Sequence, residues 1–148
     1  FGNKCGLFID NKLEQYDLPY KIYHFPSSEK VASFFNKGIF VKVQVVSKNS
    51  LKHPKLGLIK GNFVNKHKVG DFVKLLIQPE DLIHNDRSLM KFRVVDKRFV
   101  GTNFIYILEV SGNELIPVLV HSHHIHQHSI NEFFGVKTPI TIKHLVCF

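Results

Sequence analysis

The chain has no tryptophan, one methionine and two cysteines among its 148 residues, and it lacks the motifs of several enzyme classes. No G-x-x-x-x-G-K-[ST] loop is present, so the chain cannot bind ATP in the P-loop manner. H-E-x-x-H and C-x-x-C are also absent, which excludes a common zinc-protease pattern and a common redox pattern. The adjacent acids Glu80 and Asp81 would point in different directions on an extended backbone, which makes them a poor acid–base pair. We therefore expect no catalysis by this chain itself.

Long apolar runs are missing as well. No stretch approaches the roughly 20 apolar residues that a membrane-spanning helix requires, and no signal-peptide pattern opens the sequence. The cysteines Cys5 and Cys147 lie near opposite ends, and so sparse a usage fits a reducing compartment. These features predict a cytoplasmic protein that does not insert directly into a membrane.

The formal charge is +8, but the lysines are scattered and form no block of five or six. A solvated basic surface is therefore the favoured interpretation over a functional patch. A hydrophobic content of 44% with 22% charged residues is typical of a globular protein, and the length corresponds to one domain or to one small domain with an appendage.

The first part of the chain has a mixed pattern. Residues 5–15 predict a β-hairpin with Asp10-Asn11 at its turn. Asp17 can cap a short helix, and Ser27 or Ser28 can cap a second one. The segment is too small to form a stable unit alone.

From Ile39 onward the pattern is that of a sheet, with Gly61-Asn62 as a break and residues 82–87 as a polar connection. Short strands at this spacing, without helices between them, predict a mainly β barrel or sandwich of the OB kind. The predicted strands are 39–46, 56–59, 72–77, 90–100, 104–110, 115–120 and 140–146.

One stretch is distinctive: the alternating strand at 72–77 follows Gly70-Asp71 and stops at Pro79-Glu80-Asp81. It resembles the G-D-x-V-x-x-x-I-R-P-E-D segment of the TOBE domain, the small β-barrel at the C-terminus of many importer-type ABC ATP-binding subunits. Gln78 stands where that family usually has arginine.

The first 38 residues are similar to the end of the ATPase domain in such subunits. The matching positions are Gln15, Pro19, Tyr23, Pro26, Val31, Ala32 and Phe34. The resemblance implies that residues 1–37 are the C-terminal end of an ATPase domain and that residues 38–148 are a TOBE-like regulatory β domain. The chain would then be a fragment of a longer subunit.

The tail extends the resemblance through Ser122-His123-His124, His128 and the closing His144-Leu145-Val146. This pattern is similar to the subgroup of iron(III)-type and spermidine-type importers, although Asn131 replaces an expected glycine. It favours iron(III)-type uptake.

The resemblance implies a non-catalytic regulatory and dimerisation region, with ATP and Mg²⁺ bound only in the missing ATPase domain. The expected partners are a second copy of the subunit and the ABC permease subunits, so the protein would lie on the cytoplasmic side of the membrane as part of a transporter. We expect an exposed phenylalanine pair at the dimer contact. The interface and regulatory candidates are Gln78, Glu80, Asp81, Ile130, Glu132, Phe133 and Phe134.

Two alternatives use other residues. The cluster His121–His128 predicts a metal- or oxyanion-sensing barrel, in which a strand would project His124, His126 and His128 from one face as metal ligands. An OB-type barrel also binds single-stranded nucleic acid through aromatic side chains with lysines between them. The phenylalanines that fit this second pattern are Phe40, Phe63, Phe72, Phe92, Phe99 and Phe104, but most occupy alternating apolar positions that core packing explains, so no nucleic-acid partner is expected.

Overall fold

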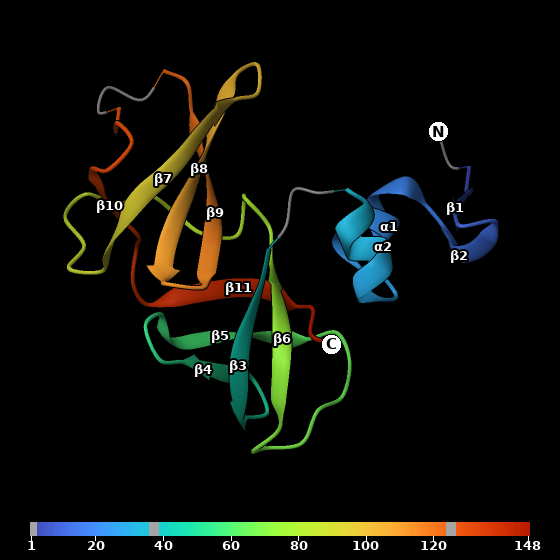
Figure 1. Cartoon of the computed structure of the whole chain (residues 1–148). Coiled ribbons are helices and arrows are strands. Elements are labelled where there is room, and N and C mark those ends of the chain that lie inside the picture. The colour runs from blue at the N-terminus through green and yellow to red at the C-terminus, as the bar shows by residue number, and fades with distance from the viewer. Residues whose placement is uncertain (1–2, 36–38, 124–126) are drawn as a thin grey trace.

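The computed structural model describes residues 3–35, 39–123 and 127–148, and the fold is mainly β, as the sequence predicts. Figure 1 shows a five-stranded barrel, a second sheet beside it and a small N-terminal unit. The N-terminal unit contains β1 (Cys5–Ile9), β2 (Lys12–Asp17), α1 (Pro19–His24) and α2 (Glu29–Phe34). The barrel contains β3 (Ile39–Ser47), β4 (Ser50–His53), β5 (Gly57–Phe63), β6 (Phe72–Ile77) and β11 (Ile140–Leu145). The second sheet contains β7 (Lys91–Phe99), β8 (Asn103–Ser111), β9 (Glu114–His121) and β10 (Phe133–Gly135).

The barrel strands follow the order β11-β5-β4-β3-β6, in which only the β5–β11 pair is parallel. The residues after β11 then pair with β6: the amide of Leu76 donates to the carbonyl of Val146 at 2.9 Å, and the amide of Lys74 donates to the carbonyl of Phe148 at 2.9 Å. This pairing closes the sheet on itself. A closed five-stranded barrel whose third and last strands are parallel has the OB-like topology, so the predicted fold class is confirmed.

Gly61 lies inside β5, so the prediction of a break at Gly61-Asn62 is wrong. Its role is a close approach between two strands. A Cβ atom at this position would lie 1.8 Å from the backbone oxygen of Ile142, where β11 carries an irregularity opposite β5. Glycine is the residue that allows such an approach.

The second sheet, in the order β10-β7-β8-β9, is inserted between β6 and β11. It shares one hydrophobic core with the barrel: buried Val41 and Leu75 of the barrel belong to the same cluster as Val94 and Leu108 of the second sheet. The two sheets are therefore packed together as one body.

Glu114 makes a polar connection between the two sheets. The ring of buried His53 accepts the amides of Lys55 and Leu56 at Nδ1, so its Nε2 carries the hydrogen that is donated to Glu114 Oε1 at 2.9 Å. Glu114 Oε2 accepts the amide of Lys42 at 2.9 Å. Burial acts to raise the pKa of Glu114, but the hydrogen bonds from Lys42 and His53 outweigh it and leave this pKa lowered.

The N-terminal unit begins with the predicted hairpin. Asp10 and Asn11 have φ values of 51° and 62°, which is the mirror-image turn that suits two-residue hairpins. Asp17 lies one residue before the cap of α1, whose cap residue is Leu18, and accepts the Leu18 amide at 2.8 Å. Ser28 caps α2, as predicted, by accepting the Val31 amide.

This unit contacts the side of the barrel where the chain ends. Ala32 of α2 packs with Leu76 and Val146, and Phe40 and Phe148 cover this small cluster. Lys74 of β6 also forms an ion pair with Glu29 at 3.1 Å. Neither helix in the described part of the chain has the length and apolar character needed to cross a membrane.

Candidate functional site

The segment Gln78–Asp81, called the junction from here on, joins the three parts of the molecule. It continues β6 of the barrel and turns back through a bond from the Gln78 amide to Asp81 Oδ2 at 2.7 Å. Gln78 Nε2 donates to the carbonyl of Tyr23 in α1 at 3.3 Å. The carbonyl of Pro79 accepts the amide of Leu119 in β9 at 2.7 Å. The distinctive Pro79-Glu80-Asp81 motif of the sequence thus lies at the point where the barrel, the second sheet and the N-terminal unit meet.

Two titratable groups have raised pKa values here: Asp81 of the junction and Tyr23 of α1. Burial raises the pKa of Asp81 to about 7, and the negative charge of Glu80 adds to the effect against the lowering influence of the Gln78 amide. Burial, together with Glu80, raises the pKa of Tyr23 to about 12. A groove of about 340 Å³ opens beside these groups, and its lining includes Tyr20 and His24 of α1 and Lys143 of β11. The junction therefore places a carboxyl with a raised pKa beside the N-terminal unit.

Of the three predicted metal ligands, His128 lies in the described part of the chain. His124 and His126 lie outside the described residues. Strand β9 ends at His121, so it does not continue to His128, and the expectation that a strand presents His128 is wrong. His121 and His123 stack on each other with ring centroids 5.8 Å apart.

His128 instead meets His84 and Asp86, and these three residues are called the His–Asp cluster from here on. His84 Nε2 lies 3.0 Å from His128 Nε2, and Asp86 Oδ1 lies 2.8 Å from each of these nitrogens. One ligating atom from each residue therefore converges on a single point in space. Within the described residues this is the one group of three such side chains that is close enough to hold a metal ion.

Backbone contacts hold the cluster in place. His84 forms an isolated antiparallel bridge with Val136, and the next amide, that of Asn85, donates to the carbonyl of Gly135 at 2.9 Å. A Cβ atom on Gly135 would lie 2.1 Å from the carbonyl oxygen of Asn85, so this close approach requires glycine. The amide of His128 donates to the hydroxyl of Tyr106 at 3.3 Å.

The ring of Phe134 packs against both histidines of the His–Asp cluster. Its ring centroid lies 4.4 Å from that of His84 and 5.0 Å from that of His128. The side chain is 1% exposed, so the expectation that Phe134 belongs to an exposed phenylalanine pair is wrong. Phe133 is 64% exposed and Ile130 is also exposed, so these two remain available for contact with another molecule.

Asn131 and Glu132 complete the surroundings. Asn131 has a φ of 74°, a conformation that glycine and asparagine adopt most easily, which accounts for asparagine where the sequence resemblance leads us to expect glycine. Glu132 Oε2 lies 3.9 Å from His128 Nδ1.

Sequence reasoning missed His84 and Asp86 because they fall in the polar connection 82–87. The available signal was the His-x-Asp spacing, which places two ligating side chains on the same side of an extended backbone.

Comparison with known proteins finds relatives of this chain among import ATP-binding proteins. A spermidine/putrescine import ATP-binding protein of Mesomycoplasma hyopneumoniae strain 232 is 26% identical over 143 residues, which is 96% of this chain and 29% of the relative. The protein of the same name in strain J is 25% identical over the same shares. The corresponding protein of Mycoplasmopsis synoviae is 29% identical over 128 residues, which is 79% of this chain and 27% of the relative.

This chain is similar to import ATP-binding proteins. It spans less than a third of the length of the relatives that it matches. No family model matches the chain. The similarity supports the importer context implied by the sequence motifs. The relatives are named for spermidine and putrescine, and none of these names supports the iron(III) expectation.

Proposed function

We propose that this chain is the non-catalytic regulatory and dimerisation region of the ATP-binding subunit of an ABC importer for polyamines of the spermidine/putrescine type. Residues 38–148 would be its TOBE-like domain and residues 1–37 the end of its ATPase domain. The observation that carries the proposal is the similarity to import ATP-binding proteins over 96% of the chain, which includes both the N-terminal unit and the barrel.

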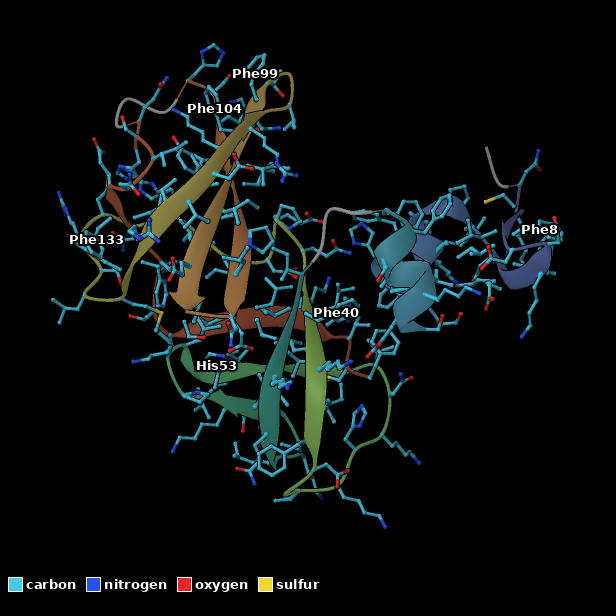
Figure 2. All side chains as sticks on the ribbon, in the orientation of Figure 1. Phe8, Phe40, His53, Phe99, Phe104 and Phe133 are labelled. Atoms are coloured by element: carbon cyan, nitrogen blue, oxygen red, sulfur yellow. The ribbon has the colours of Figure 1, made fainter. Side chains whose placement is uncertain are left out.

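The surface of the N-terminal unit supports this division. Its exposed side chains include several large apolar ones, which a packed interface would bury: Phe8, Leu13, Tyr16, Tyr20 and Phe34. Figure 2 shows Phe8 on the hairpin, at the far end from the barrel. Such a surface fits a unit that packs against further protein on this side, as the end of an ATPase domain would.

The barrel with its second sheet would hold two subunits together. Nucleotide-driven opening separates the ATPase domains, so a permanent contact elsewhere keeps the pair at a high effective concentration. Phe133 and Ile130 are the candidates for this contact, because they are exposed and apolar beside polar residues. The permease subunits would place the complex at the cytoplasmic side of the membrane.

Phe133→Asp tests the dimer contact. A charge in a symmetric contact is introduced twice, so we expect the variant of the ATP-binding subunit to self-associate at least about tenfold more weakly in sedimentation equilibrium, a loss of about 1.4 kcal/mol. Phe99→Asp is the matched control, because Phe99 is 65% exposed but lies at the other end of β7. Figure 2 shows these two phenylalanines at separate places on the second sheet. Equal association of the Phe133 variant and the unchanged subunit would contradict the placement.

Uptake measurements test the solute class. In cells depleted of the protein, we expect uptake of labelled spermidine to fall while uptake of iron(III) is unchanged. Restoring the intact subunit should restore spermidine uptake. Loss of iron(III) uptake with normal spermidine uptake would overturn the polyamine assignment.

A further inference from the structure

We propose that His84, Asp86 and His128 form a binding site for a divalent first-row transition-metal ion. The three side chains would occupy one face of a six-coordinate ion, and the remaining positions would take water or a small ligand. The inference depends on the geometry of the His–Asp cluster alone and does not require the transporter assignment.

The separations of the three ligating atoms match one face of an octahedron. The contacts measure 2.8, 2.8 and 3.0 Å. Neighbouring ligands around an octahedral ion with bonds of about 2.1 Å lie about 3.0 Å apart, whereas ligands around a tetrahedral zinc ion with the same bonds lie about 3.4 Å apart. The separations therefore match a six-coordinate ion to within about 0.2 Å, whereas for a tetrahedral ion the ligands would have to move apart by about half an ångström.

Protons satisfy this arrangement less well than a cation does. If both Nε2 atoms carry hydrogen, two N–H groups converge on one oxygen and lie 3.0 Å from each other with no hydrogen bond between them. If only one carries hydrogen, it can donate to the other nitrogen at 3.0 Å, but the lone pair of that other nitrogen also faces the carboxylate oxygen at 2.8 Å. A cation accepts the lone pairs of all three atoms at once, which removes both repulsions.

The surroundings resemble those of a prepared metal site. The side chains of His84 and His128 are 8% and 11% exposed and pack on Phe134, so their rings are held against an apolar wall. The side chain of Asp86 is 39% exposed, which leaves an entry path for the ion. Glu132 near His128 Nδ1 adds a second negative charge. Apolar packing and outer carboxylates of this kind orient ligands and strengthen binding.

The ligand set restricts the ion. Mg²⁺ and Ca²⁺ prefer oxygen ligands throughout, so two imidazoles make them poor occupants. Two histidines and one carboxylate on one face of an ion suit divalent ions from manganese to zinc, and affinity generally rises from manganese to copper and falls again at zinc.

Titration with Mn(II), Co(II), Ni(II) and Zn(II) tests the site in the intact protein. We expect one equivalent of Co(II) or Ni(II) to bind saturably in calorimetry and to raise the unfolding temperature, because an ion that binds only the folded state stabilises it. The visible spectrum of the Co(II) form should show the weak absorption of six-coordinate cobalt. The intense absorption of a four-coordinate centre would overturn the proposed geometry.

Asp86→Asn is the decisive variant, since it keeps the shape of a half-exposed side chain while removing its charge. We expect this variant and His128→Ala to bind Co(II) at least about tenfold more weakly. His121→Ala is the matched control, because it removes a nearby histidine outside the cluster and should leave the affinity unchanged. Unfolding of each metal-free variant checks that it is folded. Absence of saturable binding to the unchanged protein, or equal affinity of the folded Asp86→Asn variant, would refute the site.

Discussion

Replacing Asp81 by asparagine should stabilise the protein, and the gain should grow with pH. The structural reason is the burial of this carboxyl at the junction, next to the charge of Glu80, which raises its pKa to about 7 from 3.8. At a pH between these two pKa values, the folded chain therefore keeps a proton on Asp81 that the unfolded chain has already released. Stability is lost as the pH rises through this window, and it is lowest once Asp81 is ionised in both states.

The magnitude follows from the two pKa values. One pKa unit corresponds to about 1.4 kcal/mol, so ionisation of Asp81 costs the folded state at most about 4 kcal/mol above neutral pH. Asparagine carries no charge and keeps an oxygen that can accept the Gln78 amide. We expect the variant to exceed the unchanged protein in stability by about 3 kcal/mol more at about pH 8 than at about pH 4.5.

Urea unfolding at a series of pH values measures this difference directly. Asp10→Asn is the matched control, because it removes an exposed carboxyl from a turn that asparagine tolerates, and its stability difference should not vary in this way. Glu80→Gln should weaken the pH dependence of the unchanged protein, since it removes the neighbouring charge. A stability difference for Asp81→Asn that stays constant from acid to alkaline pH would refute the reasoning.

Two further predictions concern the barrel and its connection to the second sheet. Gly61→Ala should destabilise the protein by about 3 kcal/mol in urea unfolding, because the added Cβ would lie 1.8 Å from the Ile142 oxygen. Gly112→Ala is the control: a Cβ at this position would have nothing within 4 Å, so stability should change by less than about 0.5 kcal/mol. Equal effects of the two substitutions would argue against the close strand approach. Glu114→Ala should cost about 1–3 kcal/mol, because it removes the acceptor of the Lys42 amide and of buried His53, and Glu114→Gln should cost less because an acceptor remains. Equal losses in both variants would mean that charge, and not hydrogen bonding, connects the two sheets.

Local rules predicted those parts of the fold that depend on neighbouring residues. The turn at Asp10-Asn11, the cap at Ser28 and the end of β6 before Pro79 each follow from the chemistry of a few adjacent side chains. The short strands β4 and β10 were missed because three or four residues give too little alternation. Closure of the barrel by residues 146–148 depends on a partner about 70 positions earlier, which periodicity cannot reveal.

The candidate sites also divide into features that neighbouring residues determine and features that depend on distant residues. Adjacent residues of a strand face opposite sides of the sheet, so an exposed Phe133 implies a buried Phe134, and the expected exposed pair conflicts with that rule. The His–Asp cluster joins residues that are 44 positions apart, and only the insertion of the second sheet between β6 and β11 brings them together. A histidine-rich segment was visible in the sequence, but its partners were not.

The junction explains why one short motif is so informative about the whole molecule. A proline after β6 ends the strand, and the turn that follows directs three successive groups toward three different parts: the Gln78 side chain toward α1, the Pro79 carbonyl toward β9, and the Asp81 carboxyl back onto the Gln78 amide. Leu82 then enters the shared core, and His84 follows two residues later. These contacts therefore help to set the positions of the N-terminal unit, the second sheet and the His–Asp cluster relative to the barrel. The concentration of these contacts in a few adjacent residues gives the segment a distinctive local pattern, which is a physical reason that it can be recognised without the structure.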